Sequence, residues 1–140
     1  MGGIAVATIK GTKGNDTRNG TSGADTITGL AGNDILNGLG GNDVINGGGD
    51  DDIITGGAGR DTLTGGSGAD TFKYEALTDS PPGLGADLIK DFKAAQGDKV
   101  NLTELGTATL QSSYNASFTG LQAVFVYSAS TNQTTLSSYN

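Results

Sequence analysis

The most regular feature of the chain is an apolar residue that recurs every nine positions between residues 11 and 73. This stretch divides into seven nine-residue units, and the eighth place is apolar in six of them, while Arg18 takes it in the first. The residues beside it are mostly polar, an alternation typical of a strand with one buried face. We expect a strand at places seven to nine of each unit, with these side chains pointing inward: Ile27, Leu36, Ile45, Ile54, Leu63 and Phe72.

The six residues before each expected strand carry the signature of a tight turn. Glycine fills the first place of every unit and the fourth place of six, with Asp50 as the exception. Because glycine adopts positive φ readily, we expect positive φ at the first and fourth places. Aspartate fills the sixth place of every unit: Asp16, Asp25, Asp34, Asp43, Asp52, Asp61 and Asp70.

Two units make one coil of 18 residues, so the strands should stack into two parallel sheets with turns along both edges. Aspartates one coil apart then lie about 4.8 Å apart, at the spacing of neighbouring strands. Two bare carboxylates at that distance repel by about 3 kcal/mol at an effective dielectric constant of about 20. A divalent cation between them reverses this repulsion. The pattern therefore predicts an all-β solenoid that needs metal ions to fold.

Composition supports a cation as the partner. The chain has 15 acidic and 8 basic residues, a net charge of −7, and all its acids are aspartate except Glu75 and Glu104. This balance argues against nucleic acid. Cysteine and histidine are absent, which excludes disulfides, thiolate sites and histidine-ligated zinc. No apolar stretch reaches the length of a membrane span. Residues 1–10 do not resemble a signal peptide, and we expect a lead-in or an internal cut of a longer chain.

The nine-residue register ends at Tyr74. Residues 75–86, with Pro81 and Pro82, are expected to form a surface loop. Residues 87–92 and 97–102 have strand-like apolar positions, although the spacing of Leu88 and Phe92 also fits a helix. Residues 122–128 predict a strand, paired in a hairpin with residues 134–137.

The units resemble the GGxGxDxUx pattern of RTX proteins, whose fold is the calcium-binding parallel β-roll. The resemblance implies about five calcium ions, each held between turns one coil apart by the aspartates of both. The pairs are Asp16 with Asp34, Asp25 with Asp43, Asp34 with Asp52, Asp43 with Asp61, and Asp52 with Asp70. It also implies ligation by the backbone carbonyls of Gly20, Ser22, Gly23, Gly29, Ala31, Gly32, Gly38, Gly40, Gly41, Gly47, Gly48, Gly49, Asp50, Gly56, Gly57, Ala58, Gly59, Gly65 and Ser67.

The segments DTFKYEALTDS, DLIKDF and GDKVNL resemble the end of the β-roll in serralysin-type metalloproteases and in the R-modules of mannuronan C-5 epimerases. That resemblance implies that Asp87 and Asp91 help to ligate an ion near the end of the roll, while Asp98 is expected in a turn. We expect three parts: the lead-in 1–10, the β-roll 11–73, and a C-terminal β cap 74–140 that is truncated.

These features point to a non-catalytic module, since no base accompanies a nucleophile and no zinc-protease motif is present. The resemblance implies a secreted bacterial protein that folds on extracellular calcium and has a type I secretion apparatus and a parent catalytic domain as partners. An alternative is binding of an anionic polysaccharide such as alginate through Lys73, Lys90, Lys93 and Lys99. Ice binding is disfavoured because places three and five of the turns vary.

Overall fold

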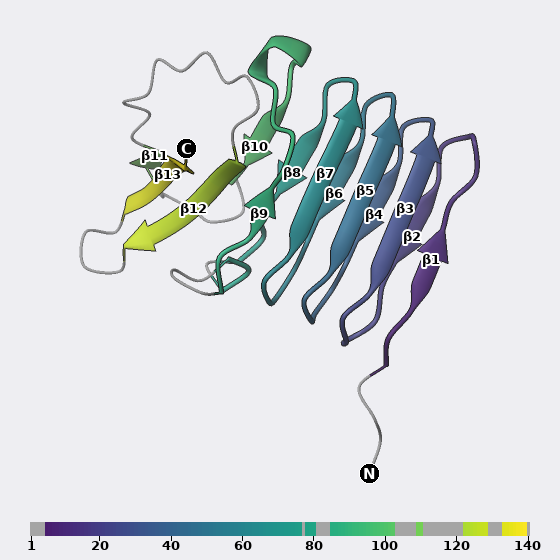
Figure 1. Cartoon of the computed structure of the whole chain (residues 1–140), viewed down its shortest axis with the longest axis horizontal. Coiled ribbons are helices and arrows are strands. Elements are labelled where there is room, and N and C mark those ends of the chain that lie inside the picture. The colour runs from purple at the N-terminus through teal and green to yellow at the C-terminus, as the bar shows by residue number, and fades with distance from the viewer. Residues whose placement is uncertain are drawn as a thin grey trace.

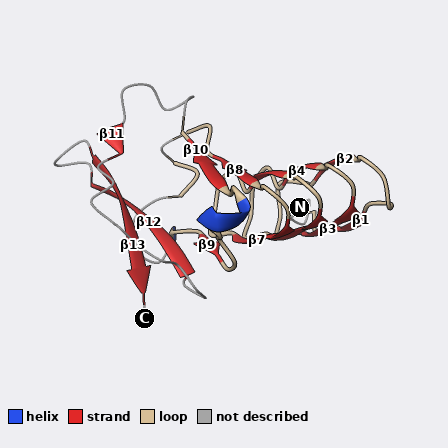
Figure 2. Cartoon of the chain, turned by 90° about the horizontal axis from the view of Figure 1, so that it is seen from above, coloured by secondary structure: helices blue, strands red, loops and turns tan. Residues whose placement is uncertain are grey.

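The inward apolar residues lie on short strands, and strands one coil apart pair in parallel. A computed structural model describes residues 5–76, 78–80, 85–102, 109–110, 122–128 and 133–139. The repeats wind into a flattened solenoid (Figure 1). Seen from above, its two sheets face each other across each coil (Figure 2). The expected all-β parallel roll is therefore confirmed.

Each sheet collects alternate strands of the solenoid. The first contains β1 (Thr8–Lys10), β3 (Thr26–Ala31), β5 (Val44–Gly49), β7 (Thr62–Ser67) and β9 (Leu88–Ile89). The second contains β2 (Thr17–Asn19), β4 (Ile35–Asn37), β6 (Ile53–Thr55), β8 (Thr71–Lys73) and β10 (Lys99–Asn101). The strand β1 lies before the first repeat unit, so the stacking begins earlier than the sequence pattern indicated.

The register aligns the inward residues into two columns. One column runs through Ile9, Ile27, Ile45, Leu63 and Ile89. The other runs through Arg18, Leu36, Ile54, Phe72 and Val100. The six apolar repeat residues are at most 1% exposed, and Phe92 packs against Phe72 with ring centroids 6.3 Å apart. Burial of these columns supplies the hydrophobic part of the stability.

The strands of the two sheets differ in length. In the second sheet they span the three expected residues, whereas β3, β5 and β7 span six. The extra length arises because the second and third places of these turns also pair with the next coil, as Leu30 does with Gly48 and Ala31 with Gly49. The turns along this edge are thus partly sheet, which the expected three-residue strands did not include.

Positive φ occurs at the second and fourth places of five turns. The expectation was therefore correct for the fourth place in these turns and wrong for the first place. Five turns have it at both places: Leu30 and Gly32, Leu39 and Gly41, Gly48 and Asp50, Gly57 and Gly59, Gly66 and Gly68. Leu30 has φ 99° and Leu39 has φ 75°, values that a side chain with a Cβ rarely adopts. The first-place glycines serve a different purpose, close approach to an aspartate.

After the repeats, the chain adds one strand to each sheet, and later strands continue the first sheet beyond β9. The strands β9 and β10 extend the two sheets, which excludes the helical alternative for Leu88. Between them lies a single 3-10 turn, η2 (Ala94–Gln96). The strand β12 (Gln122–Ser128) pairs antiparallel with both β9 and β13 (Gln133–Tyr139), which confirms the expected hairpin. The short strand β11 (Thr109–Leu110) borders β13. Part of the expected loop 75–86 lies outside the described residues.

Replacing Leu39 with glycine should stabilise the folded protein. Leu39 is 47% exposed, so its side chain contributes little to packing, and glycine removes the cost of its left-handed backbone. We expect the free energy of unfolding in saturating calcium to rise by about 1 kcal/mol, measured by denaturant titration. The matched control is Ser22→Gly, at a turn position without positive φ, which should not gain stability. Equal effects of the two changes would contradict the assignment of strain to Leu39.

Candidate metal centre

Aspartates at the sixth place form two ladders, one along each edge of the roll. In each step, the backbone N–H of one aspartate donates a hydrogen bond to Oδ1 of the aspartate one coil later. The first ladder links Asp16, Asp34, Asp52, Asp70 and Asp98 through N–O distances of 2.7, 2.8, 3.0 and 3.1 Å. The second links Asp25, Asp43, Asp61 and Asp87 through distances of 2.7, 2.8 and 2.8 Å. The side chains are therefore held at fixed positions by the backbone of the neighbouring coil.

The second carboxylate oxygen, Oδ2, lacks a hydrogen bond in most of the ladder aspartates. Within the described part of the chain, Oδ2 is buried and has no hydrogen-bond partner in Asp34, Asp43, Asp52, Asp61, Asp70 and Asp87. A buried carboxylate oxygen without a partner is costly. Six such oxygens at equivalent positions indicate a recurring positive ligand between the coils.

The first-place glycines mark the points where an aspartate and the next coil's carbonyl come close together. A Cβ on Gly47 would lie 2.2 Å from Asp52 Oδ2 and 2.7 Å from the carbonyl oxygen of Gly65, one coil later. The same pair of oxygens, an aspartate Oδ2 and a first-place carbonyl, borders the corresponding point at five glycines: Gly11, Gly20, Gly29, Gly38 and Gly47. We call each such pair of oxygens a cradle. Glycine is required at the first place because a Cβ there would collide with both oxygens.

Carboxylate and carbonyl oxygens are the donor set of a hard cation such as Ca²⁺. Among the described residues, no three acidic side chains gather closely enough to hold an ion by themselves. Each cradle must therefore combine carboxylates with backbone carbonyls. The residues present fit calcium in this respect, and they include no sulfur or imidazole ligand.

Burial among like charges disturbs the ladder carboxyl groups. Burial raises the pKa of Asp43 to about 6, and the neighbouring Asp25 adds to the effect. Burial likewise raises the pKa of Asp52 to about 7, with contributions from Asp70 and Asp34. The pKa of Asp61 rises to about 7 and that of Asp87 to about 8 for the same reason. In the folded state without a cation, these groups therefore take up protons at a much higher pH than aspartates of the unfolded chain.

The structure brings together the five aspartate pairs expected from the repeats and adds two steps to the ladders. Asp87 continues one ladder beyond Asp61, and Asp98 continues the other beyond Asp70. Asp98 was expected in a turn outside the site. The sequence did contain a signal for this position. In Asp98-Lys99-Val100-Asn101, an aspartate precedes an apolar residue by two places, as in the repeat units. However, Asp98 Oδ2 accepts the Lys93 N–H at 2.7 Å and so differs from the interior rungs.

Other acidic residues lie beside the ladders. Asp91 accepts the N–H groups of Gly65 and Gly66 at 2.9 and 2.8 Å, which closes the last turn instead of continuing a ladder. Asp50 Oδ2 accepts the Gly32 N–H at 3.0 Å. Asp79 is buried, and its charge raises the pKa values of Asp61 and Asp87, although residues 75–86 were expected to be a surface loop. Its position depends on a fold of the loop that no repeat pattern encodes.

The lysines expected to bind a polyanion do not all lie on one sheet. Lys73 on β8 and Lys99 on β10 belong to the second sheet, and Lys73 pairs with Glu75 at 2.7 Å. Lys90 directly follows β9 of the first sheet. Polysaccharide binding therefore stays a prediction from sequence.

A parallel β-roll with stacked aspartates defines a class of repeat modules, and comparison places the chain within it. Residues 5–138 match the family described as Peptidase M10 serralysin C terminal, and the chain belongs to that family. Among solved structures, the chain is similar to the AlgE6R3 subunit of the mannuronan C5-epimerase from Azotobacter vinelandii. The two are 33% identical, the match covers 89% of this chain and 69% of that chain, and the TM-score is 0.42.

A search among curated proteins found no match. In the described residues, no helix is long and apolar enough to cross a membrane.

Acidification should partly replace the cation. The raised pKa values mean that the metal-free folded ladder binds protons that the unfolded chain, with aspartate pKa 3.8, has released. Stability without metal therefore falls as pH rises from about 4 towards 8. We expect β structure in excess chelator to increase between pH 8 and pH 5, measured by circular dichroism. Asp52→Asn, which removes one titrating group, should weaken this dependence. Identical spectra of the chelated protein at both pH values would contradict the assignment.

Proposed function

We propose that this chain is a non-catalytic calcium-binding module that folds when Ca²⁺ enters its two aspartate ladders. The observation that carries the proposal is the row of buried, unpartnered Oδ2 atoms, five of which lie directly beside a first-place glycine. A cation there gives each oxygen a partner and cancels the repulsion between coils. Folding and ion binding are then a single process, because the cradles exist only when coils are stacked.

The geometry favours calcium over magnesium. Ca²⁺ accepts six to eight oxygen ligands in flexible arrangements, whereas Mg²⁺ demands regular octahedral geometry and retains several waters. Carboxylates and backbone carbonyls spaced by the coil repeat suit the more flexible coordination of Ca²⁺. The cradles suggest ions at up to five steps, with the central Asp52 serving both the Asp34 and the Asp70 step.

Family membership supports a role as an accessory module of a secreted bacterial enzyme. Extracellular calcium modules bind their ions at about 10⁻⁴–10⁻³ M, far above cytosolic calcium levels. We infer that the chain remains unfolded inside the cell, passes through a type I secretion apparatus in that state, and folds outside. In this role it would assist the folding of a parent catalytic domain.

Calcium titration followed by circular dichroism tests the proposed function. We expect little β structure in excess chelator at pH 7.5 and a cooperative gain of β signal in calcium, with magnesium at the same concentration ineffective. A folded β spectrum that persists in chelator at this pH would contradict the proposal.

Asp52→Ala should raise the calcium concentration at the folding midpoint by roughly tenfold or more, since two steps lose a carboxylate and ion binding is linked to folding. The control is Glu75→Ala, whose carboxylate is exposed and outside the ladders. Its midpoint should match that of the unmodified protein. Equal midpoints for the two variants would show that the ladder does not hold the ions.

A further inference from the structure

The seven turns fall into two conformational classes. The five turns from Gly29 onwards have positive φ at the second and fourth places. The first two turns, residues 11–16 and 20–25, have it at neither place, and both carry threonine at the second place: Thr12 and Thr21. The first coil of the roll is thus built differently from the others.

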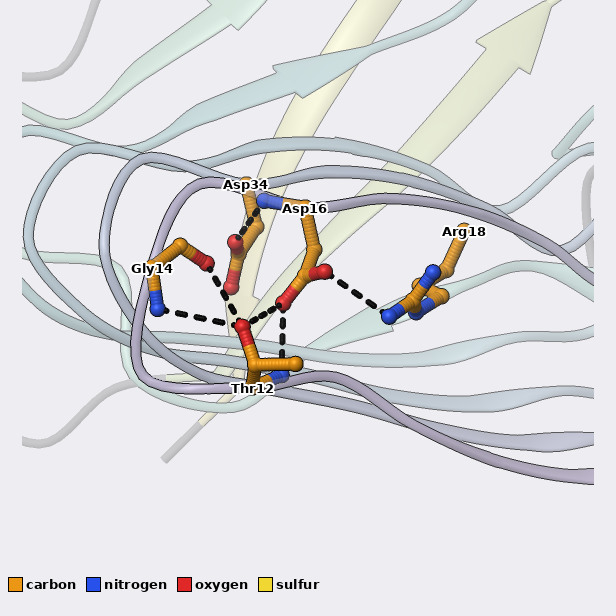
Figure 3. Close-up of polar contacts among 5 residues, drawn as sticks. All are labelled: Thr12, Gly14, Asp16, Arg18 and Asp34. Carbon is orange, nitrogen blue, oxygen red and sulfur yellow. Dashed lines mark hydrogen bonds and ion pairs between the residues drawn. The ribbon is translucent and has the colours of Figure 1, made fainter.

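Thr12 closes the first turn onto its own aspartate (Figure 3). Asp16 Oδ2 accepts the Thr12 N–H at 2.5 Å and the Thr12 hydroxyl at 2.9 Å. The Thr12 hydroxyl oxygen also accepts the Gly14 N–H at 3.2 Å. Asp16 Oδ1 is paired with Arg18 Nη2 at 2.8 Å. Both carboxylate oxygens of Asp16 therefore have donors, and one donor is a cation supplied by the chain.

Thr21 closes the second turn in the same way. Asp25 Oδ2 accepts the Thr21 N–H at 2.5 Å and the Thr21 hydroxyl at 3.0 Å. The Thr21 hydroxyl oxygen accepts the Gly23 N–H at 3.1 Å. Asp25 Oδ1 accepts the Ala7 N–H from the preceding segment. Again, no carboxylate oxygen is left without a donor.

The carboxylates of the first coil also lie farther from their first-place glycines. At Gly11 and Gly20, the point that a Cβ would occupy lies 2.9 and 2.6 Å from the aspartate Oδ2. In the five later turns, this distance is 2.1 to 2.3 Å. The aspartates of the first coil therefore differ from the later ones in position as well as in hydrogen bonding.

We propose that the first coil is a metal-independent cap, in which Thr12 and Thr21 satisfy the aspartates that calcium satisfies elsewhere. The inference rests on the proposed calcium-binding function and refines it. The steps from Asp16 to Asp34 and from Asp25 to Asp43 then carry no ion. Three of the five cradles remain, at Gly29, Gly38 and Gly47. A terminal coil that needs no ion would cap the roll, the role that terminal capping repeats have in other solenoids.

Counting bound calcium by equilibrium dialysis of the full chain, in saturating calcium, tests the cap. The double variant Asp16→Asn/Asp25→Asn should retain the ion count of the unmodified protein. Its matched control, Asp34→Asn/Asp43→Asn, alters the next coil and should lose at least two ions. A loss of ions in the first variant would overturn the inference, because it would place calcium on the first coil.

A second pair of variants tests the threonines directly and does not depend on the first coil surviving loss of its aspartates. Thr12→Gly/Thr21→Gly removes the hydroxyl donors to both carboxylates and permits the positive φ of the later turns, so we expect the count to increase by two ions. Leu30→Gly/Leu39→Gly changes the same place of later turns and should leave the count unchanged. An unchanged count in the threonine variant would overturn the inference. If the unmodified chain bound no calcium at all, the proposed function would fail and the inference with it.

Discussion

The stacking of aspartate carboxylates one coil apart is the constraint on which the rest of this structure depends. The nine-residue unit repeats the same aspartate at the same height in every coil, so like charges are forced to within a strand spacing of one another. In the interior of the ladders, a backbone N–H group satisfies one oxygen of each carboxylate, and the other is buried without a hydrogen-bond partner. Hydrophobic burial in two thin columns does not remove that penalty, whereas a bound cation would.

Much of the remaining architecture accommodates the oxygen atoms of the cradles. Glycine at the first place leaves room for the oxygens of each cradle, and the second and fourth places of five turns adopt positive φ. Leu30 and Leu39 tolerate the strained backbone, as residues near binding sites often do. The two ends of the roll are capped by different interactions. Threonine and Arg18 satisfy the first aspartates, while the chain itself returns to cover the last coil with β9 and β10.

The periodic part of the fold was predictable from the sequence, and the aperiodic part was not. The inward columns, the parallel pairing and the aspartate pairs all follow from one nine-residue register, because each residue's neighbours lie a fixed 18 positions away. Asp98 was missed because its rung is 28 residues from Asp70, a spacing that depends on how the intervening chain folds. The pairing of Arg18 with Asp16 was not predicted, because the register places Arg18 in the column but does not specify which polar group its charge contacts. Leucine at positive φ gives no sequence signal, since the backbone strain is imposed by the stacked coils.

The most direct test of the central claim is a crystal structure of the protein grown in calcium, with ions located by anomalous scattering. The account predicts a row of ions between successive coils, each coordinated at about 2.3–2.6 Å by ladder carboxylates and turn carbonyls. One of these ions should contact Oδ2 of Asp52. Folded coils with no ion between Asp34 and Asp52, or ions held only by exposed acidic residues outside the ladders, would contradict the account.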